Sequence, residues 1–140
     1  MARLRRLEIH YQRVVSQALP FTLGPAWGVP GIVARPEWTP PTDVQETASE
    51  CMVTVEIAGL LEDDYEILLY PDHLVVQGER PWRPLGDAAR IHRAEIRHGP
   101  FHAAVPIPCR PGSIDLDRIR VQYQDGLLRV HLPKVVGGRR

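Results

Sequence analysis

Histidine, cysteine and grouped carboxylates are the residues of this 140-residue chain whose types and spacing could support chemistry. His98 and His102 have the i, i+4 spacing that would place two imidazoles on one face of a helix for a metal ion. Gly99 and Pro100 lie between them, and proline disfavours a helix interior. The sequence therefore predicts no metal site and no cofactor.

Cys51 and Cys109 are the two cysteines of the chain. They form no metal-ligand spacing, and neither has a neighbouring base or cation that would favour a reactive thiolate. We interpret them as ordinary cysteines rather than as a nucleophile or a redox pair. Together with the lack of a cleavable apolar segment at the N-terminus, this favours a reducing, cytoplasmic compartment.

Glu62, Asp63 and Asp64 form an acidic group close to Gly59. Such carboxylates could serve general acid–base catalysis, but glycine and clustered acids are typical of connecting loops, and we expect a solvated turn. The sequence also has no phosphate-binding glycine loop, dinucleotide fingerprint or Ser-x-x-Lys pattern. We predict that the chain is not an enzyme.

Composition predicts one domain without a global charge signal. Hydrophobic residues make up 44% of the chain, enough for one ordinary core, and 17 basic residues balance 17 acidic ones. No run reaches the roughly 18 apolar residues of a membrane span. We therefore expect neither nucleic acid nor a membrane as a partner, with nucleic-acid binding by the arginine-rich first residues kept as an alternative.

Alternating apolar residues predict short β-strands from residue 43 onward. Asp125-Gly126 separates two such segments, and this pair favours the type I′ turn of a tight hairpin. No amphipathic helix separates the strands, so we predict an all-β, antiparallel sandwich. The positions expected to face its core include Val53, Val55, Ile57, Tyr65, Ile67, Leu69, Leu74, Val76, Phe101, Ala103, Val105, Ile107, Leu128, Val130 and Leu132.

The first 37 residues are predicted to form an arm and a linker outside the sandwich. Residues 1–19 carry apolar residues at helical spacing and predict an amphipathic helix ending at Pro20, and residues 20–41 are rich in Pro and Gly. An apolar stripe on so short a helix needs a partner, which is a client, another subunit or its own domain. The predicted arm contacts are Leu4, Leu7, Tyr11, Val14, Phe21 and Trp27.

Motifs in a fixed order run through the rest of the chain. They are W-T-P-P-T-D-V-Q-E-T at 38–47, V-E-I-A-G-L at 55–60, L-V-V-Q-G-E-R at 74–80, H-G-P-F at 98–101, V-P-I-P at 105–108 and D-G-L-L-R-V-H-L-P-K at 125–134. The series resembles the α-crystallin domain of the small heat shock proteins, the Hsp20 family, in its bacterial type. The resemblance implies an immunoglobulin-like antiparallel β-sandwich over residues 38–134, with a helical N-terminal arm and linker over 1–37 and a short C-terminal extension over 135–140.

The resemblance also implies a function. Members of the family are ATP-independent molecular chaperones, or holdases, which bind partly unfolded client proteins and suppress their aggregation under stress. Exposed apolar surface on the arm and linker is what such capture requires. The alternative is a co-chaperone or scaffold adaptor of the CS type, which shares the sandwich but binds one specific folded partner and lacks the D-G-L-L-x-V-x-L-P-K ending.

Two surfaces follow from the resemblance. The loop at 81–93 is longer than a tight hairpin needs, as in the bacterial and plant branch of the family, where a strand within it pairs with the neighbouring subunit; the alternative is a flexible surface loop. A groove between the strands at 65–70 and 101–107 would receive a tail from another subunit, and the alternative is a closed core. The predicted exchange strand is Ala88, Ala89, Arg90, Ile91 and His92, and the predicted groove residues are Ile67, Leu69, Val105 and Ile107.

Two departures from the family pattern concern assembly. Ala103 stands where members usually carry an arginine, so an ion pair near the dimer interface is missing unless Arg93 or Arg97 supplies it. The C-terminal extension reads V-V-G-G-R-R and lacks an I-x-I motif, and its adjacent Val135 and Val136 would point to opposite faces of an extended strand. We predict self-association as a dimer or small oligomer.

Overall fold

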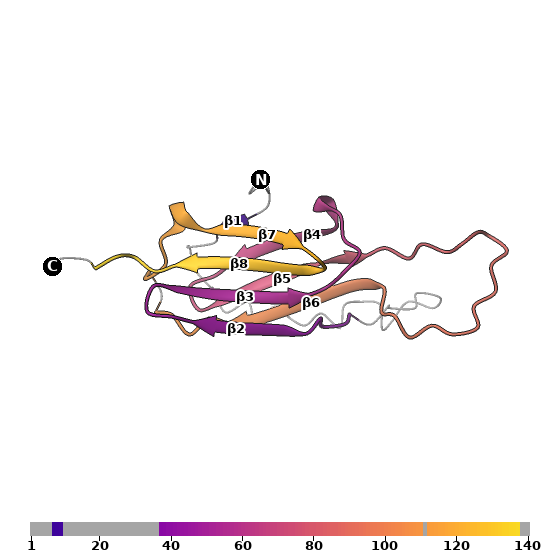
Figure 1. Cartoon of the computed structure of the whole chain (residues 1–140), viewed down its shortest axis with the longest axis horizontal. Coiled ribbons are helices and arrows are strands. Elements are labelled where there is room, and N and C mark those ends of the chain that lie inside the picture. Colours follow the sequence, from indigo (N-terminus) through magenta and orange to yellow (C-terminus); the bar gives the residue numbers. More distant parts are fainter. Residues whose placement is uncertain (1–6, 10–36, 111, 138–140) are drawn as a thin grey trace, which may run out of the picture.

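Two β-sheets pack face to face in the computed structural model, which describes residues 7–9, 37–110 and 112–137 (Figure 1). The first sheet has the strand order β1-β4-β5-β6 and the second has the order β2-β3-β8-β7. All neighbours pair antiparallel except β1 and β4, which are parallel. The antiparallel sandwich predicted from the alternating pattern is confirmed.

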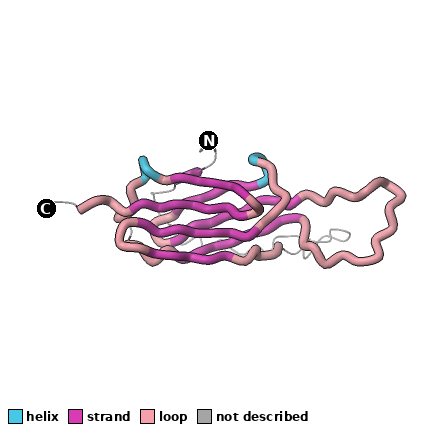
Figure 2. Tube along the Cα trace, viewed as in Figure 1, coloured by secondary structure: helices cyan, strands magenta, loops and turns pink. Residues whose placement is uncertain are grey.

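The strands are short, and two 3-10 turns are the helical elements in the described part of the chain (Figure 2). The first sheet comprises β1 (Leu7–Ile9), β4 (Tyr65–Leu69), β5 (His73–Arg80) and β6 (Gly99–Pro106). The second comprises β2 (Thr42–Glu46), β3 (Glu50–Glu56), β7 (Arg120–Gln124) and β8 (Leu127–Pro133). The turns are η2 (Glu62–Asp64), which precedes β4, and η3 (Leu116–Arg118), which precedes β7.

One apolar core lies between the sheets, and the alternation of side-chain direction along each strand explains which residues enter it. Successive side chains of a strand point to opposite faces, so every second residue enters the core. Leu128, Val130 and Leu132 of β8 are fully buried, as are Val53 and Val55 of β3. The positions predicted from the alternation to face the core are buried, except for Tyr65, Gly78, Val121 and Tyr123, which are half-buried.

The turn between β7 and β8 has the predicted geometry. Asp125 has φ 54° and Gly126 has φ 76°, the two positive values that a type I′ turn requires. Gln124 and Leu127 are the paired residues on either side of the two-residue turn. A backbone turn encoded by two adjacent residues thus sets the register of the hairpin.

Tyr123 ties the second sheet to the connection that leads into the first. Its hydroxyl donates a hydrogen bond to the carbonyl oxygen of Ile57 at 2.8 Å and accepts one from the amide of Leu60 at 3.2 Å. The ring also lies 6.0 Å from that of Tyr65 on β4. Burial raises the pKa of Tyr65, so its hydroxyl stays protonated at neutral pH. These contacts of Tyr123 fix the connection between β3 and β4.

The predicted N-terminal helix is wrong for Leu7–Ile9, which form strand β1. Leu7 pairs with Ile67 and Ile9 with Leu69, so the outer edge of β4 supplies the hydrogen-bonding partner. A sheet edge offers a row of backbone donors and acceptors, and this tertiary contact overrides the helical spacing of a short segment. The other predicted arm contacts, Leu4, Tyr11, Val14, Phe21 and Trp27, lie outside the described residues.

Candidate assembly and client-binding surfaces

The connection between β5 and β6, residues 81–98, is the most exposed described segment of the molecule, and we call it the long loop. It extends beyond the end of the sandwich, on the right of Figure 1. Four of its large apolar side chains are exposed, and Leu85 is fully exposed at 101%. These four are Trp82, Leu85, Ile91 and Ile96. Isolated exposed apolar residues are ordinary, but four on one loop indicate a surface that meets a partner.

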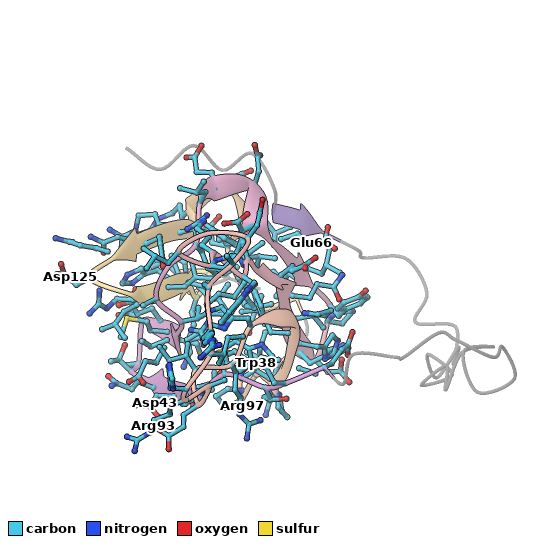
Figure 3. The ribbon with its side chains drawn as sticks, turned by 90° about the vertical axis from the view of Figure 1, so that its right-hand side faces the viewer. Trp38, Asp43, Glu66, Arg93, Arg97 and Asp125 are labelled. Atoms are coloured by element: carbon cyan, nitrogen blue, oxygen red, sulfur yellow. A yellow bond between two sulfur atoms is a disulfide. The ribbon has the colours of Figure 1, made fainter. Side chains whose placement is uncertain are left out.

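The predicted exchange strand lies in the middle of the long loop. Residues 88–92 are all exposed, and they form no strand in this single chain. Figure 3 looks at the sandwich from the side of the loop, with Arg93 and Arg97 labelled. Ala88 lies in a turn in which the Ala89 amide donates to the carbonyl oxygen of Gly86 at 3.1 Å, and the exposed residues that follow are accessible to a strand of a second subunit.

Arg80 anchors the base of the long loop. Its Nε donates a hydrogen bond to the carbonyl oxygen of Arg97 at 2.7 Å, which joins the two ends of the loop. The guanidinium lies 4.5 Å above the centre of the Trp38 ring, and burial lowers the pKa of Arg80 without discharging it at neutral pH. Trp82 and His98 also meet edge to face, with ring centres 4.8 Å apart. The loop therefore leaves the sandwich from a fixed base.

Segments that precede β2 in the sequence pair with β4 and β6 of the first sheet. At one edge, β1 pairs with β4. At the other, the Trp38 amide donates to the carbonyl oxygen of Pro100 at 3.2 Å, and the His102 amide donates to the carbonyl oxygen of Trp38 at 3.0 Å. The Trp38 ring then packs 5.9 Å from that of Phe101. Within the described residues, Leu7–Ile9 thus pair with the outer edge of β4, and Trp38 pairs with that of β6 around Phe101.

The second sheet has different edges. In the described ranges, β2 pairs only with β3, and β7 only with β8. Strand β2 is largely exposed, and Asp43, Val44 and Glu46 all face solvent. Glu46 also forms an ion pair with Lys134, with 2.6 Å between Oε1 and Nζ. Among the described residues, the outer edge of β2 therefore has no strand partner, and it carries the exposed Asp43 and the Lys134-paired Glu46.

The predicted groove between residues 65–70 and 101–107 is wrong in position. Strand β5 lies between β4 and β6 and pairs with both, so these strands do not border a common groove. The four predicted groove residues are buried members of the core. The sequence interpretation failed because alternation shows which residues point inward and leaves the lateral order of the strands undetermined. These residues are Ile67, Leu69, Val105 and Ile107.

Ala103 is likewise part of the core. It lies on the inward face of β6, buried at 1% exposure, and pairs with Val76 of β5. An alanine at this position fills a core site rather than presenting a charge. Within the described residues, no ion pair of Arg93 or Arg97 replaces the one that the family arginine would make.

The prediction of ordinary, unpaired cysteines is wrong, because Cys51 and Cys109 form a disulfide. They are 58 residues apart in the sequence, and the sandwich brings together the strand and the loop that carry them. The Glu46 carboxylate lies within 4.8 Å of both sulfurs, and these three residues are the one group with metal-ligand chemistry in the described part of the chain. Sulfurs bonded to each other are not thiolate ligands, so this group is no metal centre in the disulfide form.

The other candidate chemistry has structural roles. His98 packs on Trp82, and His102 lies on strand β6. The acidic group forms the 3-10 turn η2, in which Asp64 Oδ2 accepts a hydrogen bond from the Leu61 amide at 2.7 Å. A Cβ at Gly78 would collide with the Asp64 carbonyl oxygen, so glycine lets this turn lie against β5. In the same described residues, no helix has the length and hydropathy to cross a membrane.

Several residues that shape these surfaces had no clear signal in the sequence. Arg80 was noted only as the end of the G-E-R motif, and its contacts with Trp38 and Arg97 join positions 42 and 17 residues away. The Glu46–Lys134 pair joins the two ends of the sandwich sequence. Opposite charges and an aromatic residue are compatible with many pairings, so only the fold reveals which ones form.

The topology, the long β5–β6 loop and the open β2 edge define an α-crystallin type of β-sandwich. The model of the Hsp20/alpha crystallin family matches residues 43–139, which is most of the chain. This chain belongs to that family. Its members are generally chaperones and not enzymes.

Relatives and solved structures agree with this assignment. Heat shock protein 16 of Schizosaccharomyces pombe is 32% identical over 101 residues, which cover 71% of this chain and 68% of that protein. The solved structure of heat shock protein 16.0 from the same organism has a TM-score of 0.64 at 30% identity, covering 74% of this chain and 94% of that one. A small heat-shock protein from Xylella fastidiosa, whose structure is described as a distinct high order structure, has a TM-score of 0.60 at 26% identity and covers 75% of this chain and 95% of that one.

The match is to the sandwich, and the relatives are longer. Small heat shock protein C4 of Rickettsia felis is 24% identical over 96 residues, or 69% of this chain, and these residues are 57% of that relative. The matched residues thus span between about a quarter and about two thirds of the length of the curated relatives.

Proposed function

We propose that this chain is an ATP-independent holdase that binds partly unfolded client proteins and suppresses their aggregation under stress, in the cytoplasm. The observation that carries the proposal is the exposed apolar surface of the long loop on a sandwich of this family. A partly unfolded client exposes apolar segments and unpaired strand edges. Burial of apolar surface is favourable without any coupled reaction, so capture of this kind needs no nucleotide.

The client surface in this proposal has two parts. The first comprises Leu85 and Ile96, which are exposed on the long loop outside the exchange strand. The second is the N-terminal arm, with Leu4, Leu7, Tyr11, Val14, Phe21 and Trp27 as its predicted contacts. The buried groove candidates have no part in it, because their side chains are already inside the core.

The test is the aggregation of a heated model client, followed by light scattering with and without ATP. We expect an equimolar amount of the chain to suppress scattering equally in both conditions. A chain lacking residues 1–37 loses the arm and strand β1, and we expect strands β2 to β8 to stay folded while part of the suppression is lost. No suppression, combined with tight binding of one folded partner, would contradict the holdase and support a CS-type adaptor.

Assembly is the second part of the proposal. We propose that the chain forms a dimer or small oligomer in which residues 88–92 of one subunit pair with the outer edge of β2 in its neighbour. Addition of a strand to an open edge satisfies backbone groups on both sides. The charges are complementary, because Arg90 and Arg93 lie at the loop strand and the exposed Asp43 lies on β2, where Glu46 is already paired with Lys134. Opposite charges across paired strands favour the correct partner and register.

Charge reversal tests this pairing. We expect Arg90→Glu to shift the protein toward monomer in native mass measurement, because it places an acidic residue against the acidic β2 edge. Arg83→Glu is the matched control, since Arg83 is exposed on the same loop outside the exchange strand. The double variant Arg90→Glu/Asp43→Lys is expected to recover part of the dimer. An unchanged mass for Arg90→Glu would contradict the pairing.

A further inference from the structure

The Cys51–Cys109 disulfide joins strand β3 to the segment that follows β6, at a point where neither cysteine pairs with the other's strand or segment. Cys51 lies on β3 of the second sheet, and Cys109 lies in the segment that follows β6 of the first sheet. We call residues 107–110 and 112–119 the crossing segment, because the chain passes here from the first sheet to the second. The Cα atoms of the two cysteines are 7.3 Å apart. The covalent bond therefore fastens the crossing segment to the second sheet.

The crossing segment also holds the C-terminal end of the sandwich. The Asp115 amide donates to the Pro133 carbonyl oxygen at 2.7 Å, and the Val135 amide donates to the Ser113 carbonyl oxygen at the same distance. Ile114 and Lys134 form an isolated β-bridge between these two bonds. Beyond this bridge, Val135 and Val136 are exposed. Order in the crossing segment is thus coupled to order at the end of the chain.

We propose that Cys51 and Cys109 form a reversible thiol–disulfide exchange site that clamps the crossing segment, and with it residues 133–135, onto the sandwich. The bond is not needed to fill the core, because a reduced cysteine is itself a small apolar residue that tolerates burial. Reduction therefore leaves the sandwich folded and removes the covalent restraint on the crossing segment. This inference does not depend on the holdase activity.

Exposure decides where exchange begins. Cys51 is 0% exposed and Cys109 is 8% exposed, so Cys109 is the one residue of the pair with any exposure to solvent, and we place the first attack at its sulfur. With a small dithiol as reductant, one thiolate attacks this sulfur, the S–S bond breaks, and Cys51 leaves as a thiolate that takes up a proton. The second thiol of the reductant then displaces Cys109, which is protonated in turn. The reductant becomes a cyclic disulfide, and two electrons reach the protein; a low-molecular-weight disulfide reverses the reaction.

The first test is a redox titration of the full chain in mixtures of reduced and oxidised glutathione, followed by thiol alkylation and mass spectrometry. The chain has two cysteines, so each molecule carries no alkyl group when oxidised and two when reduced. We expect both populations to appear within the titration and to interconvert in either direction. A bond that stays intact at the most reducing ratio, or that never forms at the most oxidising one, would overturn the proposal.

The second test measures amide hydrogen exchange in the oxidised and reduced protein. We expect the amides of Asp115 and Val135 to exchange roughly tenfold faster after reduction, while the amide of Val76 in β5 stays protected. The double variant Cys51→Ala/Cys109→Ala controls for effects of the reductant, since its exchange should not respond to the buffer. Equal exchange of Asp115 and Val135 in both states would show that the bond clamps nothing. If Val76 lost protection as well, the bond would be needed for the whole fold, which also contradicts the proposal.

Discussion

Leu128 and Leu85 are the same residue type in opposite surroundings. Leu128 is 0% exposed on β8 in the middle of the sandwich, whereas Leu85 is 101% exposed on the long loop. Leu128 belongs to an alternating pattern that lets one strand face contribute to a common core. Leu85 stands between turn-forming residues, where no sheet face can bury it. The comparison indicates that apolar residues in an alternating strand pattern build the core, and that apolar residues of the long loop remain exposed to solvent.

The largest expected effect on the free energy of unfolding is at Leu128, the buried residue of this comparison. Leu128→Ala removes three carbons from a closed core and leaves a cavity, so we expect it to lower the free energy of unfolding by about 2–5 kcal/mol. Urea denaturation measures the change. An unchanged midpoint would contradict the assignment of Leu128 to the core.

A smaller effect on the free energy of unfolding is expected at Tyr123, which ties the second sheet to the connection that leads into the first. Tyr123→Phe keeps the ring but removes the hydroxyl that bridges Ile57 and Leu60. We expect a loss of about 1 kcal/mol in the free energy of unfolding, as for other intramolecular hydrogen bonds. Thermal or urea denaturation tests this value. A loss as large as that of Leu128→Ala would mean that the ring packing, rather than the hydroxyl, carries the contribution of Tyr123.

The smallest effect on stability is expected on the exposed side. Leu85→Ser removes no intramolecular burial, so the free energy of unfolding should change by less than about 0.5 kcal/mol. The same denaturation experiment measures it. A substantial loss of stability would show that Leu85 packs in the assembled protein and is not a free apolar surface.

The sequence predicts the features of this structure that depend on neighbouring residues, and it misses those that depend on distant ones. The core residues and the hairpin at Asp125-Gly126 are predicted well, because alternation and a turn dipeptide act over a few neighbouring residues. The lateral order of the strands is a long-range property, so the groove between 65–70 and 101–107 was placed wrongly. The Cys51–Cys109 bond was not predicted for the same reason, since it depends on where the crossing segment meets β3 in the folded chain.

The N-terminal segment shows a third limit. Leu7 fits the helical spacing of Leu4 and Tyr11, and with Ile9 it also fits a strand alternation, because both periods are compatible with so few residues. The edge of β4 decides between them, and this edge exists only after the sandwich has formed. Local sequence alone could not contain that information. For candidate surfaces, the sequence identifies the long loop by its length, and the structure adds which of its apolar residues are exposed.

The most direct test of the central claim is the suppression of client aggregation by the double variant Leu85→Ser/Ile96→Ser, measured by light scattering at a fixed molar ratio. Arg83→Ser is the control on the same loop, and native mass measurement confirms that all proteins assemble alike. We expect the double variant to remain folded and to suppress aggregation at least several-fold less than the wild type, with the control unchanged. Suppression equal to that of the wild type would contradict the claim that the exposed apolar residues of the long loop bind clients.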